Sequence, residues 1–313
     1  MKRMALLMLA LLSVQAPAAG ERADSGGVDV SHEAVLMGTT LLEVAGSFTR
    51  RYTIPFLRGN GPLTADNNVS VALTANVAPI YANAAVEAVW TPAAFAQLSV
   101  GGRAGSGWNI DFFGTMCYGI GINREKEDGA GAAEVSASPF DGLLWKTHAG
   151  GALQFDLAAV IPGDWNHVVA RSYHEINYKG YTRAKPGESW YNDNDFGENC
   201  NGLNYHGDLL VGYQTPAFVN TVGLLTEADL YLYDTPGRES WRDDKFRWTF
   251  TGLVNFTVVK QRLEAALLLQ FRTRWKYTDG NWQDLYYRKR TIDANDPVRM
   301  EFYRLAAAVV YKL

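Results

Sequence analysis

Apolar and polar residues alternate along most of this chain. Phe246, Trp248 and Phe250 fall on one face of an extended segment, while Arg247 and Thr249 fall on the other. A period of two residues is typical of a β-strand that lies between an apolar and a polar environment, because successive side chains point to opposite sides. The pattern therefore predicts an all-β protein.

The alternation recurs often enough to outline the whole fold. It predicts about twelve strands, within a range of about ten to fourteen, since boundaries inferred from sequence are uncertain by a few residues. Several are much longer than the ~5–6 residues that are common in soluble proteins. The predicted strands cover residues 40–57, 68–77, 80–90, 94–104, 108–122, 142–160, 164–182, 203–215, 217–233, 244–259, 262–278 and 298–313.

The predicted connections alternate between short and long. Transmembrane barrels have short periplasmic turns and longer external loops, so this pattern favours a barrel that crosses a membrane. A short connection at Thr91-Pro92-Ala93 falls on the external side and breaks the pattern. The short connections are Ala78-Pro79, Gly105-Ser106, Ile161-Pro162-Gly163, Thr215-Pro216 and Lys260-Gln261. The long, polar ones are 58–67, 123–141, 183–202, 234–243 and 279–297.

The N-terminus has the features of a secretory signal peptide. Lys2 and Arg3 precede a short apolar run, and the small residues around Ala18 and Ala19 offer a cleavage site. Beyond residue 20, no apolar stretch is long enough for a transmembrane helix. We therefore expect a signal peptide over 1–19, a periplasmic lead-in over 20–38 and a transmembrane β-barrel over 39–313.

The last strand carries a resemblance to a known class. Side chains alternate to the last residue through Tyr303, Leu305, Val309, Tyr311 and Leu313. This segment resembles the C-terminal strand of porin-like bacterial outer-membrane β-barrel proteins, although that strand usually ends in an aromatic residue. The resemblance implies a transmembrane, antiparallel up-and-down barrel in the cell outer membrane. It also implies contact with outer-membrane lipid, with lipopolysaccharide or its equivalent, and with the barrel-assembly machinery.

Composition narrows the classes of function. The 29 basic residues against 33 acidic ones give a net charge of −4, which argues against nucleic-acid binding. Two cysteines, Cys117 and Cys200, do not make a disulfide scaffold. The sequence contains no zinc-ligand spacing, nucleotide motif or phosphate-binding loop, so we expect no metal and no cofactor.

Polar rows on the predicted strands are expected to face the inside of the barrel. The cluster of Arg272, Arg274 and Lys276, with Arg247 on the preceding strand, is the best candidate for contact with anionic solutes. The alternative is that acidic residues on nearby strands neutralise it and only stabilise the wall. The candidate lumen-lining residues are Arg247, Arg272, Arg274, Lys276, Glu227, Asp229 and Glu264.

Three hypotheses for function follow. The preferred one is a narrow channel for passive passage of small hydrophilic solutes. The second is a non-conducting surface, structural or adhesin-like barrel that acts through its external loops. The third is a lipase-type hydrolase that uses Ser172 and His174 on the lipid-facing row. Same-face neighbours on a strand are ~7 Å apart, and no outward Asn or Asp completes a triad, so we expect no catalytic residues and no enzyme.

Overall fold

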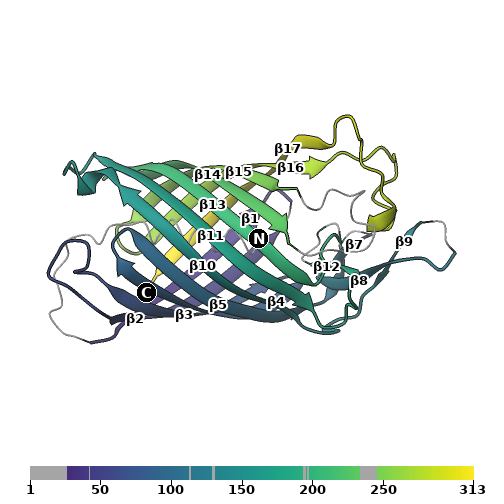
Figure 1. The fold of residues 1–313 in the computed structure, drawn as a ribbon, viewed down its shortest axis with the longest axis horizontal. Coiled ribbons are helices and arrows are strands. Elements are labelled where there is room, and N and C mark those ends of the chain that lie inside the picture. Colours follow the sequence, from purple (N-terminus) through teal and green to yellow (C-terminus); the bar gives the residue numbers. More distant parts are fainter. Residues whose placement is uncertain are drawn as a thin grey trace.

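The alternating strands close into one antiparallel barrel (Figure 1). The computed structural model describes residues 27–41, 43–112, 114–128, 131–192, 195, 197–232 and 245–313. The predicted signal peptide over 1–19 and the predicted loop over 234–243 lie outside these residues. The wall strands of the described chain are β1 (Asp29–Thr39), β2 (Val44–Pro55), β3 (Asn68–Ala78), β4 (Tyr81–Ala93), β5 (Ala96–Gly107), β10 (Leu144–Asp156), β11 (His167–Tyr181), β13 (Gly202–Gln214), β14 (Val219–Tyr231), β15 (Arg247–Val259), β16 (Leu263–Trp275) and β17 (Val298–Lys312).

The barrel is of the up-and-down type with twelve wall strands, as the sequence predicts. Each strand pairs with the next one along the wall, and β1 closes the sheet by pairing with β17. Five short strands lie outside the wall. They are β6 (Asn109–Phe112), β7 (Thr115–Tyr118), β8 (Ile120–Glu125), β9 (Ala133–Ser136) and β12 (Ser189–Asn192).

The predicted lead-in over 20–38 is wrong from Asp29 onward, because this segment forms β1. The outward residues of β1 include Val30 and Leu36, which fit the period of two. Its inward residues Val35 and Met37 are also apolar, since they join a cluster inside the barrel. Because both faces of β1 carry apolar residues, its sequence does not alternate between apolar and polar residues, and the pattern does not predict a strand there.

The strand predicted over 108–122 is also wrong. Its first part is the hairpin β6–β7, and its last residues begin β8. Gly114 adopts a φ of +80°, which favours glycine, and its N–H donates to Asp111 Oδ1 at 2.8 Å. This tight turn breaks a segment that alternates like a single strand.

These two errors cancel in the strand count but invert the predicted direction of every strand before residue 108. We call the end where β17 finishes the terminal end, and the opposite end the loop end. The turn at Pro79 lies at the loop end, and the segment 58–67 lies at the terminal end, both opposite to the prediction. Gly105 and Ser106 lie within β5. The exception at Thr91-Pro92-Ala93 disappears, because β4 finishes at the terminal end.

The outer face of the wall is apolar. Leu36, Val100 and Leu153 are each about 60% exposed, at 61%, 59% and 62%. Aromatic rings flank this surface, with Trp145 stacked on Tyr178 towards the loop end and Trp165 exposed at the terminal end. No helix in the described residues is long and apolar enough to cross a membrane.

An apolar surface of this extent matches lipid rather than water. A closed sheet also pairs the backbone of every wall strand with a neighbour, which the bilayer core demands. The chain is therefore a transmembrane β-barrel, and this architecture belongs to the outer membrane.

Candidate functional site: the barrel lumen

The inside of the barrel is packed on one side and hollow on the other. Inward apolar side chains of β1, β11 and β13 to β17 form a buried cluster in which Leu268 and Val310 have no exposed surface. A polar cavity of about 570 Å³ occupies the remaining space. It is lined from Ser31 and Leu313 at the terminal end to Lys146 and Lys179 near the loop end. The cavity therefore follows the barrel axis for most of its length.

The charges that line the cavity balance. Six cationic side chains face six carboxylates, apart from the histidines and the chain terminus. Several are paired across neighbouring strands: Arg171 Nη1 lies 3.2 Å from Asp208 Oδ1, and Lys146 contacts Glu175. The cations are Arg51, Arg103, Lys146, Arg171, Lys179 and Lys312. The carboxylates are Glu33, Glu87, Glu175, Asp208, Glu227 and Asp229.

Three of the cations form a group near the loop end. Lys146 on β10 is directly opposite Arg103 on β5 and Lys179 on β11 in the strand register. Like charges in directly opposed positions destabilise a sheet unless they are compensated. Glu175 compensates Lys146 from the adjacent strand. The group places a high density of positive charge at one level of the lumen.

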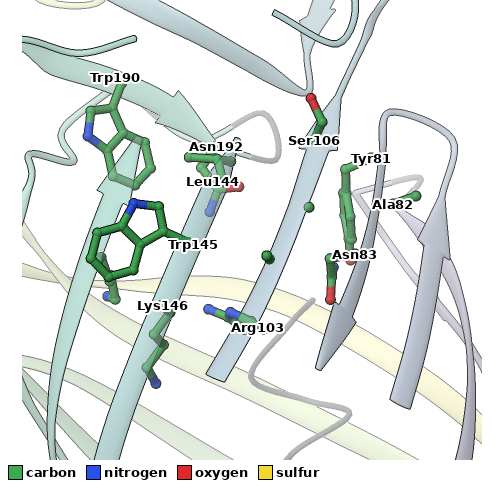
Figure 2. A pocket seen from close by; sticks show the side chains of 13 residues that line it. Tyr81, Ala82, Asn83, Arg103, Ser106, Leu144, Trp145, Lys146, Trp190 and Asn192 are labelled. Atoms are coloured by element: carbon green, nitrogen blue, oxygen red, sulfur yellow. The ribbon is translucent and has the colours of Figure 1, made fainter. Parts of the chain in front are cut away.

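The basic group also lines a second, smaller pocket at this level of the wall. This pocket, of only about 30 Å³, shares Arg103, Lys146 and Lys179 with the large cavity. Trp190 and Asn192 of β12 also line it, and Figure 2 shows Asn192 beside Leu144, at the end of the strand that carries Lys146. External loop residues therefore reach over the wall at this level.

Tyr173 on β11 shapes the middle of the cavity. Its hydroxyl donates to Glu175 Oε2 at 3.0 Å and lies 3.3 Å from Ser99 Oγ. Gly150 on β10, which is opposite Glu175 in the register, leaves room for the Tyr173 hydroxyl, since a Cβ there would lie 2.6 Å from the hydroxyl oxygen. The ring can therefore lie close to the wall, and the lumen beside it stays open.

The predicted lumen residues occupy several different environments. Glu227 and Asp229 line the cavity, and His206 Nδ1 lies 3.0 Å from Asp229 Oδ1. Arg247 is opposite Asp229 in the register, with its guanidinium 4.0 Å from the centre of the Tyr231 ring. Glu264 Oε1 lies 2.7 Å from Lys312 Nζ.

The predicted cluster of Arg272, Arg274 and Lys276 does not form a single inward row. Arg272 Nε lies 2.9 Å from Glu301 Oε1, and Arg274 Nη1 lies 3.6 Å from the same oxygen. Both guanidinium groups thus share Glu301 on β17, which also pairs with Arg299. Lys276 lies outside the wall because β16 ends at Trp275, and its ammonium pairs with Asp296 of the following loop at 2.8 Å.

Two kinds of lumen residue escape prediction from the sequence. Tyr173 lies two residues from both Arg171 and Glu175, so all three point to the same face of β11. This alternation could have placed Tyr173 on the inner face. Trp190 and Asn192 have no such signal. They belong to a loop whose position depends on contacts with distant segments, which strand periodicity does not describe.

The outward pair Ser172 and His174 is closer than the strand spacing predicts. Ser172 Oγ lies 3.1 Å from His174 Nε2, and His174 Nδ1 lies 2.6 Å from the Tyr205 hydroxyl. The third group is thus a neutral phenol, which does not stabilise an imidazolium as a carboxylate does. Both residues lie on β11, whose backbone pairs with β10 and β13. Its N–H groups therefore form sheet hydrogen bonds and do not offer the oxyanion hole that a hydrolase needs.

No protein-family model and no curated protein sequence matches this chain. Among solved structures, the KdgM porin is similar over 90% of this chain and 98% of its own, with 8% identity and a TM-score of 0.35. The NanC porin is similar over 91% of this chain and all of its own, with 8% identity and a TM-score of 0.42. OmpT, an outer membrane protein of Vibrio cholerae, is similar over 93% of this chain and all of its own, with 8% identity and a TM-score of 0.31. Independently of these likenesses, the closed register and the apolar outer face identify the chain as an outer-membrane β-barrel.

Proposed function

We propose that this barrel is a narrow channel for the passive passage of small hydrophilic solutes, without enzymatic activity. The observation that carries the proposal is the polar cavity of about 570 Å³ along the inside of a closed, lipid-facing wall. Its size is within the ~300–1,000 Å³ of pockets that hold small molecules. Its hydrated, charged lining would replace part of the water shell of a polar solute.

The balance of six cations and six carboxylates makes weak overall charge selectivity the expected behaviour. The basic group near the loop end is the best place to alter it. Arg103→Glu reverses one charge where Arg103, Lys146 and Lys179 converge. Lys276→Glu makes the same change outside the lumen, where Lys276 pairs with Asp293 and Asp296.

Conductance across a planar bilayer tests the proposal. We expect discrete, reproducible steps from the purified barrel. Under a salt gradient, Arg103→Glu should shift the reversal potential towards cation selectivity, while Lys276→Glu should leave it near the wild-type value. Silence from protein shown to be folded would overturn the channel proposal.

The non-conducting surface barrel is the second candidate. The observation that favours it is the order of the long external connections, where Ile120, Ile122 and Trp190 form a buried core with Leu144 and Tyr181. A folded external surface of this kind could bind a partner without transport. Silence in the bilayer assay would support this candidate.

We also infer the route to the membrane. The proposal requires export through the N-terminal signal peptide and insertion by the barrel-assembly machinery. The alternating side chains of β17, with Tyr311 exposed at its end, support this inference because they resemble the C-terminal strand of outer-membrane barrels.

A further inference from the structure

In the part of the chain that the structure describes, the long connections at the loop end form two bodies, which we call leaves. The first leaf is the three-stranded sheet β12–β8–β9, which joins residues of 108–143 with residues of 182–201. The second leaf is the segment 276–297, which connects β16 to β17. Figure 1 shows both beyond the same end of the barrel.

The first leaf is anchored to the rim of the barrel by apolar contacts. Ile120 and Ile122 of β8 and Trp190 of β12 are buried with Leu144 and Tyr181, which stand at the loop end of β10 and β11. Trp190 Nε1 also donates to Asn201 Oδ1 at 3.0 Å. Trp190 lines the small pocket above the basic group, so this leaf covers one side of the lumen.

The second leaf meets the first through polar contacts. Arg290 is 1% exposed, and its Nη1 lies 3.0 Å from Glu198 Oε1 in the connection that follows β12. The same carboxylate oxygen accepts the Tyr277 hydroxyl at 3.2 Å. A backbone bridge between Ala132 and Leu285, with two flanking backbone hydrogen bonds, joins the leaves at a second point. Lys289 Nζ, which lies 3.3 Å from Glu125 Oε1, and Arg288, which contacts the Gly187 carbonyl, add two further contacts.

Arg290 is held firmly within its own leaf. Its guanidinium lies 5.2 Å from the centre of the Trp282 ring and 5.7 Å from those of Tyr277 and Tyr287. Its Nε donates to the Leu285 carbonyl at 3.1 Å. The rings fix the cation where it faces Glu198, so the pair joins two bodies that are each ordered by other contacts.

We propose that the two leaves are a gate over the loop end of the lumen and that the Glu198–Arg290 pair is its latch. The inference rests on the proposed channel function. The described lining of the large cavity stops at the basic group and includes no residue of either leaf. Opening requires the second leaf to separate from the first, while the apolar anchor keeps the first leaf on the rim.

A charge pair with a buried arginine and a partly exposed glutamate suits a latch better than an apolar contact does. Each charge is stabilised chiefly when the other is in place, so the closed state depends on both. Once the leaves part, water solvates both groups, which lowers the cost of the open state. The latch can therefore release without unfolding either leaf.

The test uses Glu198→Gln, which keeps the shape of the side chain but removes its charge. A thiol placed in the lumen by Ser99→Cys, in a chain with Cys117→Ser and Cys200→Ser, reports access from the loop side when barrels inserted in one orientation in vesicles meet a membrane-impermeant reagent on that side only. We expect Glu198→Gln to increase the labelling rate of this thiol by about tenfold, because the amide replaces an ion-paired hydrogen bond to Arg290 by a weaker one that has no charge on the acceptor. Lys276→Gln, which alters an exposed pair within the second leaf, should leave the rate unchanged.

A cross-link tests the same motion without touching the latch. Ala132 and Leu285 face each other in an antiparallel bridge, and this spacing suits a disulfide. Ala132→Cys with Leu285→Cys should hold the leaves together under oxidising conditions. We expect oxidation to cancel the gain produced by Glu198→Gln, and reduction to restore it.

The outcomes separate the gate from the channel. Equal labelling of Glu198→Gln and the parent protein overturns the latch, whether or not the barrel conducts. Faster labelling that oxidation suppresses, in a barrel that stays silent in bilayers, supports the gate and overturns the channel. Faster labelling together with larger or more frequent conductance steps supports both.

Discussion

At the scale of single residues, the wall is held by polar chains as well as by its apolar cluster. Arg304 on β17 is 3% exposed on its side chain, and its Nε donates to Gln270 Oε1 at 2.7 Å. Its Nη1 contacts Glu43, which follows β1. Gln270 Nε2 in turn donates to Thr251 Oγ1 at 2.9 Å. This chain of contacts connects β15, β16, β17 and the turn after β1.

Arg304 should therefore matter more for stability than an exposed arginine on the same strand. Removing one partner of a buried ion pair costs about 3–5 kcal/mol, whereas an exposed pair contributes about 0–1 kcal/mol. We expect Arg304→Ala to lower the free energy of unfolding by about 3 kcal/mol or more. Arg299→Ala, at a side chain that is 49% exposed, should change it by about 1 kcal/mol at most.

Urea unfolding in lipid vesicles, followed by tryptophan fluorescence, measures both variants. Equal losses from Arg304→Ala and Arg299→Ala would show that the buried chain adds no stability of its own. A larger loss from Arg299→Ala would contradict the ranking outright.

At the scale of elements, the loop after β12 is organised around one carboxylate. Asp195 Oδ1 accepts the backbone N–H groups of Asn192 and Gly197 at 3.1 and 3.0 Å, and Oδ2 accepts Asn199 Nδ2 at 2.6 Å. Burial raises the pKa of this carboxyl to about 6, although these hydrogen bonds act in the opposite direction. The loop should therefore respond to pH in a mildly acidic range.

The sign of the response follows from the raised pKa. The folded loop binds a proton more tightly than the unfolded chain, whose aspartate has its ordinary pKa of 3.8. The resulting stabilisation is complete below about pH 4 and is lost as the pH rises through about 6. We expect residues 189–201 to resist proteolysis better at pH 5 than at pH 7.5, once protease activity is corrected for pH.

Two variants check that the response comes from this group. Asp195→Asn cannot titrate and should abolish the difference between the two pH values. Asp164→Asn, at an exposed site at the terminal end, should retain it. A wild-type loop that is better protected at pH 7.5 would refute the assignment.

The elements also show where sequence reasoning succeeds. Strands such as β14 and β16 are found because their outer faces are apolar and much of their inner faces is polar. The segment that forms β1 is missed because Val35 and Met37 place apolar side chains on its inner face as well. Periodicity reports a difference between two environments, so it fails where both sides of a strand are apolar.

The lumen follows the same rule. Parity places Glu227 and Asp229 on the inner face, and both line the cavity. Parity cannot show that Glu301 neutralises Arg272, or that Trp190 lies above the basic group. These contacts depend on the register between strands and on loop packing, which a single strand does not encode.

At the scale of the whole molecule, the barrel should behave as one cooperative unit. Its wall has no free sheet edge, and its outer face requires lipid or detergent. We expect unheated protein in sodium dodecyl sulfate to stay folded and to migrate faster on a gel than the boiled sample. It should also partition into the detergent phase.

The boiled sample is the control for the unfolded chain. Identical migration before and after boiling would argue against a stable closed barrel. Monomeric protein that stays dissolved in buffer without detergent would contradict the membrane-spanning wall itself.

The seam between β1 and β17 sets the order of events during biogenesis. Glu33 faces Lys312, so two residues almost a full chain length apart must meet before the wall is complete. Translation must therefore finish before β1 and β17 can pair with each other, and a high contact order makes this a slow step. Until then, both strands offer unpaired backbone to any other polypeptide. A cell that makes this protein must keep the nascent chain from aggregating until its last residues arrive.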